Sequence, residues 1–205
     1  MLCSRSAIVH LGLGLLLAAG CATTDGAVKH VPRTGLKAAD YYPLAEGWKW
    51  AYDVEQDGQR GLGIYSVIEH TAEGATIMAG PERLTYLIKP EGLARMDAGG
   101  VGDFVLKNPL VKDATWPVAG GTARVVSTTD EVTTDAGRFY DCAVIEVTRS
   151  DPPRLTRTTF APDVGPVDIE VQVQQNGKYV VATHARLRSA TKPGGDPFAA
   201  TAPSP

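Results

Sequence analysis

The amino-acid sequence predicts an all-β protein in which one strongly curved antiparallel sheet forms a half-barrel or open barrel. Along several segments, large apolar residues occupy every second position, which places them on one face of a strand. Short turns separate these segments, as is typical of antiparallel sheets with one buried face. A single sheet must curl, or pack on a second sheet, to hide that face from water.

The first strand is predicted at residues 48–55, which read WKWAYDVE. Trp48, Trp50 and Tyr52 fall on one face of this strand, opposite its charged residues. A row of three aromatic side chains more often belongs to a core than to a binding groove. The row can also stack sugars or line a lipid groove, so these three residues are the candidate ligand-groove residues of the sequence.

Two hairpins complete the strand pattern. Residues 122–134 and 138–149 flank Asp135-Ala136-Gly137, and the alternating run 167–174 is followed by Asn176-Gly177 and a strand at 178–188. Further strands are predicted at residues 61–71, 84–88, 93–96 and 155–160. The total is roughly eight to ten strands, and residues 41–190 contain no convincing helical period.

Composition and length place the chain among ordinary globular proteins. Its 205 residues are 43% hydrophobic and 21% charged, which suits one domain with a real core. The net charge of −3 argues against a nucleic-acid binder, which usually has a strongly basic face. We predict a signal peptide at 1–20, a flexible tether at 21–40, a β domain at 41–190 and a disordered tail at 191–205.

The first twenty residues have the layout of a secretory signal. Arg5 precedes a mostly apolar run from Ala7 to Ala19, which is too short to be a comfortable membrane span. The sequence therefore predicts export.

Residues 17–21, LAAGC, resemble the lipobox of bacterial lipoproteins. This resemblance implies that Cys21 receives a diacylglycerol on its sulfur, that the signal is cut before it, and that the new amino group is acylated. Two or three acyl chains anchor a protein stably, whereas one chain binds only marginally. In the sorting rule of such proteins, Ala22 in place of Asp favours the outer membrane.

Three stretches, 41–52, 136–142 and 160–167, resemble a family of uncharacterised bacterial lipoproteins. They match its aromatic-Pro-Leu opening followed by Gly and Trp, its Ala-Gly-x-Phe hairpin, and its aromatic-Ala-x-x-Val-Gly-x-Val turn. The resemblance implies a curved half-barrel similar in outline to lipoprotein carriers, which can hold acyl chains on the concave face. The chain departs from the family at residues 112–115, where relatives usually have a Gly before the Trp.

Residues that carry chemistry are sparse in the mature chain. Of its histidines, His30 lies in the predicted tether, and His70 and His184 lie in predicted strands without metal-ligand spacing. There is no Gly-x-Ser-x-Gly elbow, and Cys142 is expected to be a small buried hydrophobe. We therefore expect no cofactor, no metal and no enzymatic activity, although His70 or His184 beside acidic residues in an open cleft would favour an enzyme.

The sequence-based hypothesis is a non-enzymatic binding module held in the bacterial envelope by its acyl anchor, on the outer membrane facing the periplasm or the cell surface. Its partner is an envelope protein or a lipid. The alternative is a carrier or acceptor of lipid or another hydrophobic ligand, which requires a large apolar cavity.

Overall fold

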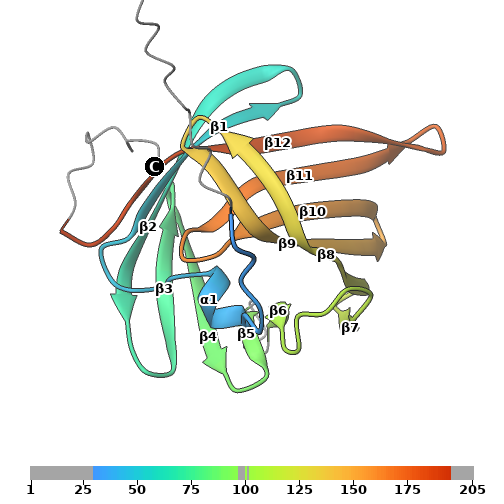
Figure 1. The fold of residues 1–205 in the computed structure, drawn as a ribbon. Coiled ribbons are helices and arrows are strands. Elements are labelled where there is room, and N and C mark those ends of the chain that lie inside the picture. The colour runs from blue at the N-terminus through green and yellow to red at the C-terminus, as the bar shows by residue number, and fades with distance from the viewer. Residues whose placement is uncertain (1–29, 97–99, 101, 195–205) are drawn as a thin grey trace, which may run out of the picture.

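A computed structural model describes residues 30–96, 100 and 102–194. Twelve antiparallel strands form one sheet in the order β6-β5-β4-β3-β2-β1-β12-β11-β10-β9-β8-β7, which curls into a nearly closed barrel (Figure 1). The predicted curved antiparallel sheet is confirmed. The expected signal peptide and Cys21 lie outside the described residues. Within the described part, no helix is long and apolar enough to cross a membrane.

The sheet has more strands than the roughly eight to ten predicted, and three of its strands were not among those predicted. These are β3, β6 and β7. In chain order the elements are α1 (Ala38–Tyr41), β1 (Lys49–Gln56), β2 (Gln59–His70), β3 (Gly74–Ala79), β4 (Glu82–Lys89), β5 (Gly92–Arg95), β6 (Asp103–Lys107), β7 (Thr115–Val118), β8 (Gly121–Thr134), β9 (Gly137–Ser150), β10 (Pro153–Ala161), β11 (Gly165–Gln175) and β12 (Lys178–Thr191).

The two faces of the sheet follow the alternation in the sequence. On β1, Trp50 and Tyr52 point into the barrel and are buried, while Asp53 and Glu55 lie on the outer face. On the neighbouring β12, Leu187 is buried inside and Arg186 lies outside, opposite Asp53. The interior is therefore an apolar core, and the outer surface carries the charged side chains.

The barrel is closed at the seam between β6 and β7 by side chains rather than by a backbone ladder. The indole N–H of Trp116 donates to the carbonyl of Phe104 at 2.8 Å. The Asp103 carboxylate accepts the N–H of Ala119 at 2.8 Å and pairs with Arg149 at 3.1 Å. These contacts join the two edges of the sheet, and an unjoined sheet edge invites pairing with another chain.

Part of the expected tether makes defined contacts with the β domain. We expected residues 21–40 to be a flexible tether and the β domain to span 41–190. Residues 30–40 instead lie on the barrel, and α1 inserts Ala38 and Tyr41 into the core. Tyr42 follows them between Trp50, Tyr86 and Phe160. The last strand ends at Thr191, one residue beyond the expected boundary.

Candidate functional site

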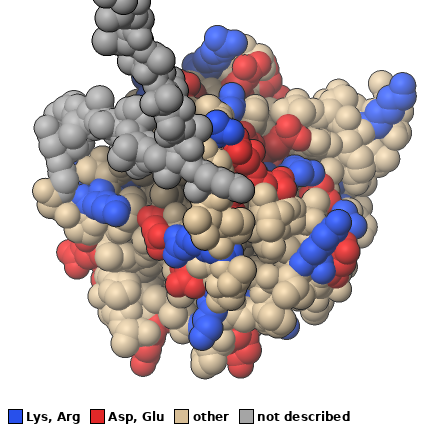
Figure 2. All heavy atoms as spheres, in the orientation of Figure 1, with Lys and Arg blue, Asp and Glu red and all other residues tan. Residues whose placement is uncertain are grey.

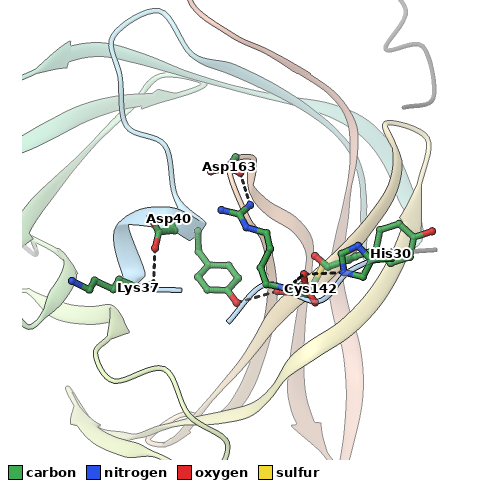
Figure 3. Close-up of polar contacts among 9 residues, drawn as sticks. His30, Lys37, Asp40, Cys142 and Asp163 are labelled. Carbon is green, nitrogen blue, oxygen red and sulfur yellow. Dashed lines mark hydrogen bonds and ion pairs between the residues drawn. The ribbon is translucent and has the colours of Figure 1, made fainter. Parts of the chain in front are cut away.

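The first candidate feature is the segment 30–37, which we call the N-terminal strap. It joins the expected membrane anchor to α1 and is held on the barrel by two carboxylates (Figure 3). His30 Nε2 lies 2.9 Å from a carboxylate oxygen of Asp141, and the N–H of Arg33 donates to the same oxygen at 2.9 Å. The Arg33 guanidinium donates to Asp163 at 2.5 Å.

A bulge in β9 aims two side chains at the strap. Asp130 of β8 lies opposite Cys142, but Val132 lies opposite Phe139, so β9 contains one extra residue at this point. Asp141 there has a φ of +52° inside a strand, where an L-residue rarely adopts positive φ. The bulge turns Asp141 toward His30 and stacks Tyr140 on the His30 ring at 4.4 Å between centroids.

The Asp141 carboxylate is held in its charged form although only 6% of its side chain is exposed. Burial by itself raises its pKa. The hydrogen bonds from the N–H of Arg33 and from His30, with the charges of both residues, outweigh burial and leave the pKa below its ordinary value. A charged acceptor forms stronger hydrogen bonds than a neutral one, which suits a residue that holds two groups of the strap.

Beneath the strap, Asp141 also holds α1, through its backbone. The Tyr41 hydroxyl donates to the Asp141 carbonyl at 3.0 Å, and burial raises the pKa of that hydroxyl to about 12. The adjacent Cys142 thiol is fully buried, and burial together with the charges of Asp130, Asp141 and Glu131 raises its pKa to about 12. Cys142 is therefore a thiol at neutral pH and not a nucleophile.

The structure places the three candidate groove residues in the core. Trp48, Trp50 and Tyr52 are 6%, 1% and 2% exposed. The two indoles stack on each other at 5.6 Å, and Tyr52 packs edge-on against Tyr65. The Trp50 N–H donates to the carbonyl of Val164, and the Tyr52 hydroxyl donates to that of Pro166. Each polar group of these two side chains is therefore satisfied within the protein.

The second candidate feature is an open cleft of about 600 Å³ on the outer side of β2, β1 and β12. The turn between β8 and β9 contributes Asp135 to its wall. The cleft combines charged side chains of both signs with a few apolar groups. Its lining residues are Asp53, Val54, Glu55, Arg60, Gly61, Leu62, Asp135, His184, Arg186 and Arg188.

Ion pairs order the charged side of this cleft. Arg188 Nε contacts both carboxylate oxygens of Asp53, at 2.9 and 3.0 Å. His184 Nε2 lies 3.2 Å from both oxygens of Asp168 on β11, and Arg186 lies 3.4 Å from the same carboxylate. Arg60, by contrast, is highly exposed and lies 3.6 Å from its nearest acid. His70, the other histidine singled out in the sequence, lies at the end of β2 and does not line the cleft.

The charges continue beyond the cleft in a regular order. Directly paired residues on six adjacent strands form one line of ionisable side chains with both signs interspersed. This line is Glu55, His184, Glu170, Arg157, Glu146 and Arg124. Figure 2 shows Lys and Arg (blue) and Asp and Glu (red) interspersed over the face that it draws.

His184 lines the open cleft and pairs with Asp168, which is the arrangement that we expected to favour an enzyme. None of the residues that line the cleft is Ser, Thr or Cys. Within the described residues, no three His, Cys, Asp or Glu side chains are placed together to hold a metal ion.

Comparison with known proteins adds two similarities in outline. No protein-family model matches the chain, and no curated protein matches it either. A Bacteroides fragilis structure described as an exported protein with a YmcC-like fold matches over 74% of this chain and 99% of its own, with 15% identity and a TM-score of 0.46. A structure described as a lipoprotein from Parabacteroides distasonis matches over 74% and 98%, with 15% identity and a TM-score of 0.38.

Proposed function

We propose that this chain is a lipid-anchored module of the bacterial cell envelope that binds a partner and catalyses no reaction of its own. The observation that carries the proposal is the spacing between two features. The sequence LAAGC ends at Cys21, and the chain is already fixed to the barrel at His30. An acylated Cys21 would hold the barrel beside the membrane, and Ala22 favours the outer membrane as its location.

The short spacing between Cys21 and His30 limits how far the barrel can lie from the membrane. Eight residues separate Cys21 from His30, and a fully extended chain of that length spans at most about 30 Å. A small domain has a comparable diameter, so the docked barrel would stay within about one diameter of the lipid surface. This supports a module that works next to its membrane rather than a shuttle.

The anchor is tested by Cys21→Ala in the full chain. We expect the variant to leave the membrane fraction and to lose incorporation of labelled palmitate, because the acceptor thiol is absent. Cys3→Ala is the matched control, since Cys3 lies in the expected signal peptide and should leave both properties unchanged. Membrane retention of the Cys21→Ala variant would overturn the lipid anchor.

The cleft on β2, β1 and β12 is the surface that we assign to partner binding. Its ion-paired wall lies beside exposed apolar side chains of β2, of which Leu62 and Ile64 are 56% and 54% exposed. Apolar contacts flanked by charges of both signs match a polypeptide segment with both acidic and basic residues. Arg60, which is loosely held, is free to pair with an acidic group of the partner.

Site-specific photo-crosslinking in intact envelopes tests this surface. A photoreactive residue at Leu62 should give a discrete protein adduct that disappears on Arg60→Glu, because charge reversal disrupts the cleft. The same group at Ile88, an exposed apolar position of β4, is the control and should give no such adduct. Equal adducts at both positions, or none at Leu62, would contradict binding at the cleft.

A hydrophobic-ligand carrier is the alternative, and it has less support. Trp48, Trp50 and Tyr52 are packed against other core residues rather than around an open groove. Native mass spectrometry of the full chain, followed by organic extraction, separates the two functions. Stoichiometric lipid in the β domain, beyond the acyl groups of Cys21, would favour the carrier, and an otherwise empty protein would favour the binding module.

A further inference from the structure

The N-terminal strap and α1 are adjacent in the chain but are held in different ways. Side chains of α1 enter the core, where Ala38 and Tyr41 are each 1% exposed. The strap lies on the surface, and most of its residues are exposed. Its polar and ring contacts with the barrel are with Asp141, Asp163 and Tyr140, and the partly buried side chain of Leu36 packs against the core. The strap can therefore leave the barrel at the cost of these contacts and of the partial burial of Leu36, while the side chains of α1 stay in the core.

The contact that holds the strap is built into the barrel. Asp141 and Asp163 have φ values of +52° and +59°. Asp163 lies in the turn between β10 and β11, where positive φ is ordinary, whereas Asp141 lies within β9. A bulge that re-aims a side chain commonly marks a functional position. Here the re-aimed carboxylate receives both His30 and the N–H of Arg33.

We propose that residues 30–37 are a releasable strap, latched by Asp141, that sets how far the barrel can move from its membrane anchor. This inference rests on the proposed anchoring at Cys21. With the strap docked, eight residues separate Cys21 from the first fixed residue, His30. With the strap released, sixteen residues separate Cys21 from Ala38, and the maximal span rises from about 30 Å to about 60 Å.

Release doubles the reach and leaves the buried side chains of α1 in the core, and Leu36 is the apolar side chain that loses its packing. Three contacts keep α1 attached independently of the Asp141 carboxylate. Tyr41 donates to the Asp141 carbonyl, the N–H of Ala38 donates to the Asn108 side chain at 2.9 Å, and the N–H of Asp163 donates to the Asp40 carbonyl at 2.7 Å. A partner that lies beyond the docked reach would become accessible to the same cleft.

Limited trypsin digestion of the full chain in detergent tests the latch. Cleavage after Arg33 requires the strap to leave the barrel, because proteases need an extended, accessible segment. Asp141→Gly removes the carboxylate and still permits positive φ. We expect it to accelerate this cleavage at least about tenfold, because two hydrogen bonds to a charged group are lost. Asp57→Gly is the matched control, with a φ of +50° in the turn between β1 and β2.

A second variant keeps the test decisive if Asp141→Gly folds poorly. His30→Ala removes one latch contact from the strap side and should accelerate the same cleavage by a smaller factor, while the thermal unfolding midpoint changes little. Unchanged cleavage after Arg33 in both variants would overturn the latch.

The reach is measured separately, on the lipidated protein in vesicles. Energy transfer from a dye on Lys178→Cys to a dye in the lipid surface should change on Asp141→Gly and not on Asp57→Gly. The buried Cys142 does not compete for the dye. Accelerated cleavage with no change in energy transfer would overturn the role of the strap in reach. Failure of anchoring appears instead as loss of Cys21-dependent membrane binding, so the two failures are distinguishable.

Discussion

Cys142 shows how one residue type changes its chemistry with its surroundings. It is the single cysteine of the described chain, and it is fully buried beside three carboxylates. We predict that the native protein does not react with iodoacetamide at pH 8, because the pKa of this thiol is about 12, and that it reacts once unfolded in guanidinium. Intact mass spectrometry measures both states, and rapid labelling of the native chain would contradict the buried position.

The lowered pKa of Asp141 predicts that the folded protein loses stability at acid pH. Its pKa in the folded protein is below the ordinary 3.8, so the folded state binds this proton less readily than the unfolded state. The contribution of the carboxylate to stability is therefore complete above about pH 5 and is lost as the pH falls below about 4. The free energy of unfolding, measured against pH by guanidinium titration, should show this loss.

Asp141→Asn is the comparison for the acid step, because it keeps the size of the side chain and removes its charge. At neutral pH we expect it to lower the free energy of unfolding by about 2 kcal/mol, the scale of hydrogen bonds to a charged group. The difference between wild type and variant should shrink as the pH falls below about 4. A difference that stays constant down to pH 2 would show that this carboxylate is not the titrating group.

At the scale of elements, the pairing of β8 with β9 depends on the absence of a side chain at Gly121. A Cβ there would lie 1.9 Å from the carbonyl oxygen of Thr148 on the neighbouring strand. We predict that Gly121→Ala lowers the free energy of unfolding by at least about 2 kcal/mol, because the backbone must shift. Gly61→Ala on β2 meets nothing within 4 Å and should be neutral or stabilising by about 0.5 kcal/mol. Similar values for the two variants in a thermal melt would argue against this pairing.

The elements with a strong local signal could be predicted from the sequence. Asn176-Gly177 joins β11 and β12 with φ values of +51° and +77°, which is the conformation that this dipeptide favours. The strap could not be predicted, because its contacts join residues more than 100 positions apart and it has no periodic pattern. The proximity of His184 and Asp168 could not be predicted either, since it depends on the register of β11 against β12.

At the scale of the whole molecule, the curvature of the sheet follows from its apolar face, which the alternation along several strands indicates. How the barrel closes could not be predicted from the sequence, because β6 and β7 are short and the seam between them depends on individual side chains. Asp103 is the clearest of these, since its carboxylate joins β6 to the β7–β8 turn and to Arg149 of β9.

The seam should consequently open more readily than the rest of the barrel. We predict that Asp103→Ala accelerates hydrogen exchange of the Ala119 amide and of neighbouring β7 amides, because their anchor to β6 is lost. Amides at the centre of β9 and β10, which are laddered on both sides, should keep their protection. Glu82→Ala, an exposed change at the start of β4, is the control and should leave the seam unchanged. Uniform acceleration over all strands would instead mean that the barrel opens only as a single cooperative unit, with the seam no weaker than its laddered strands.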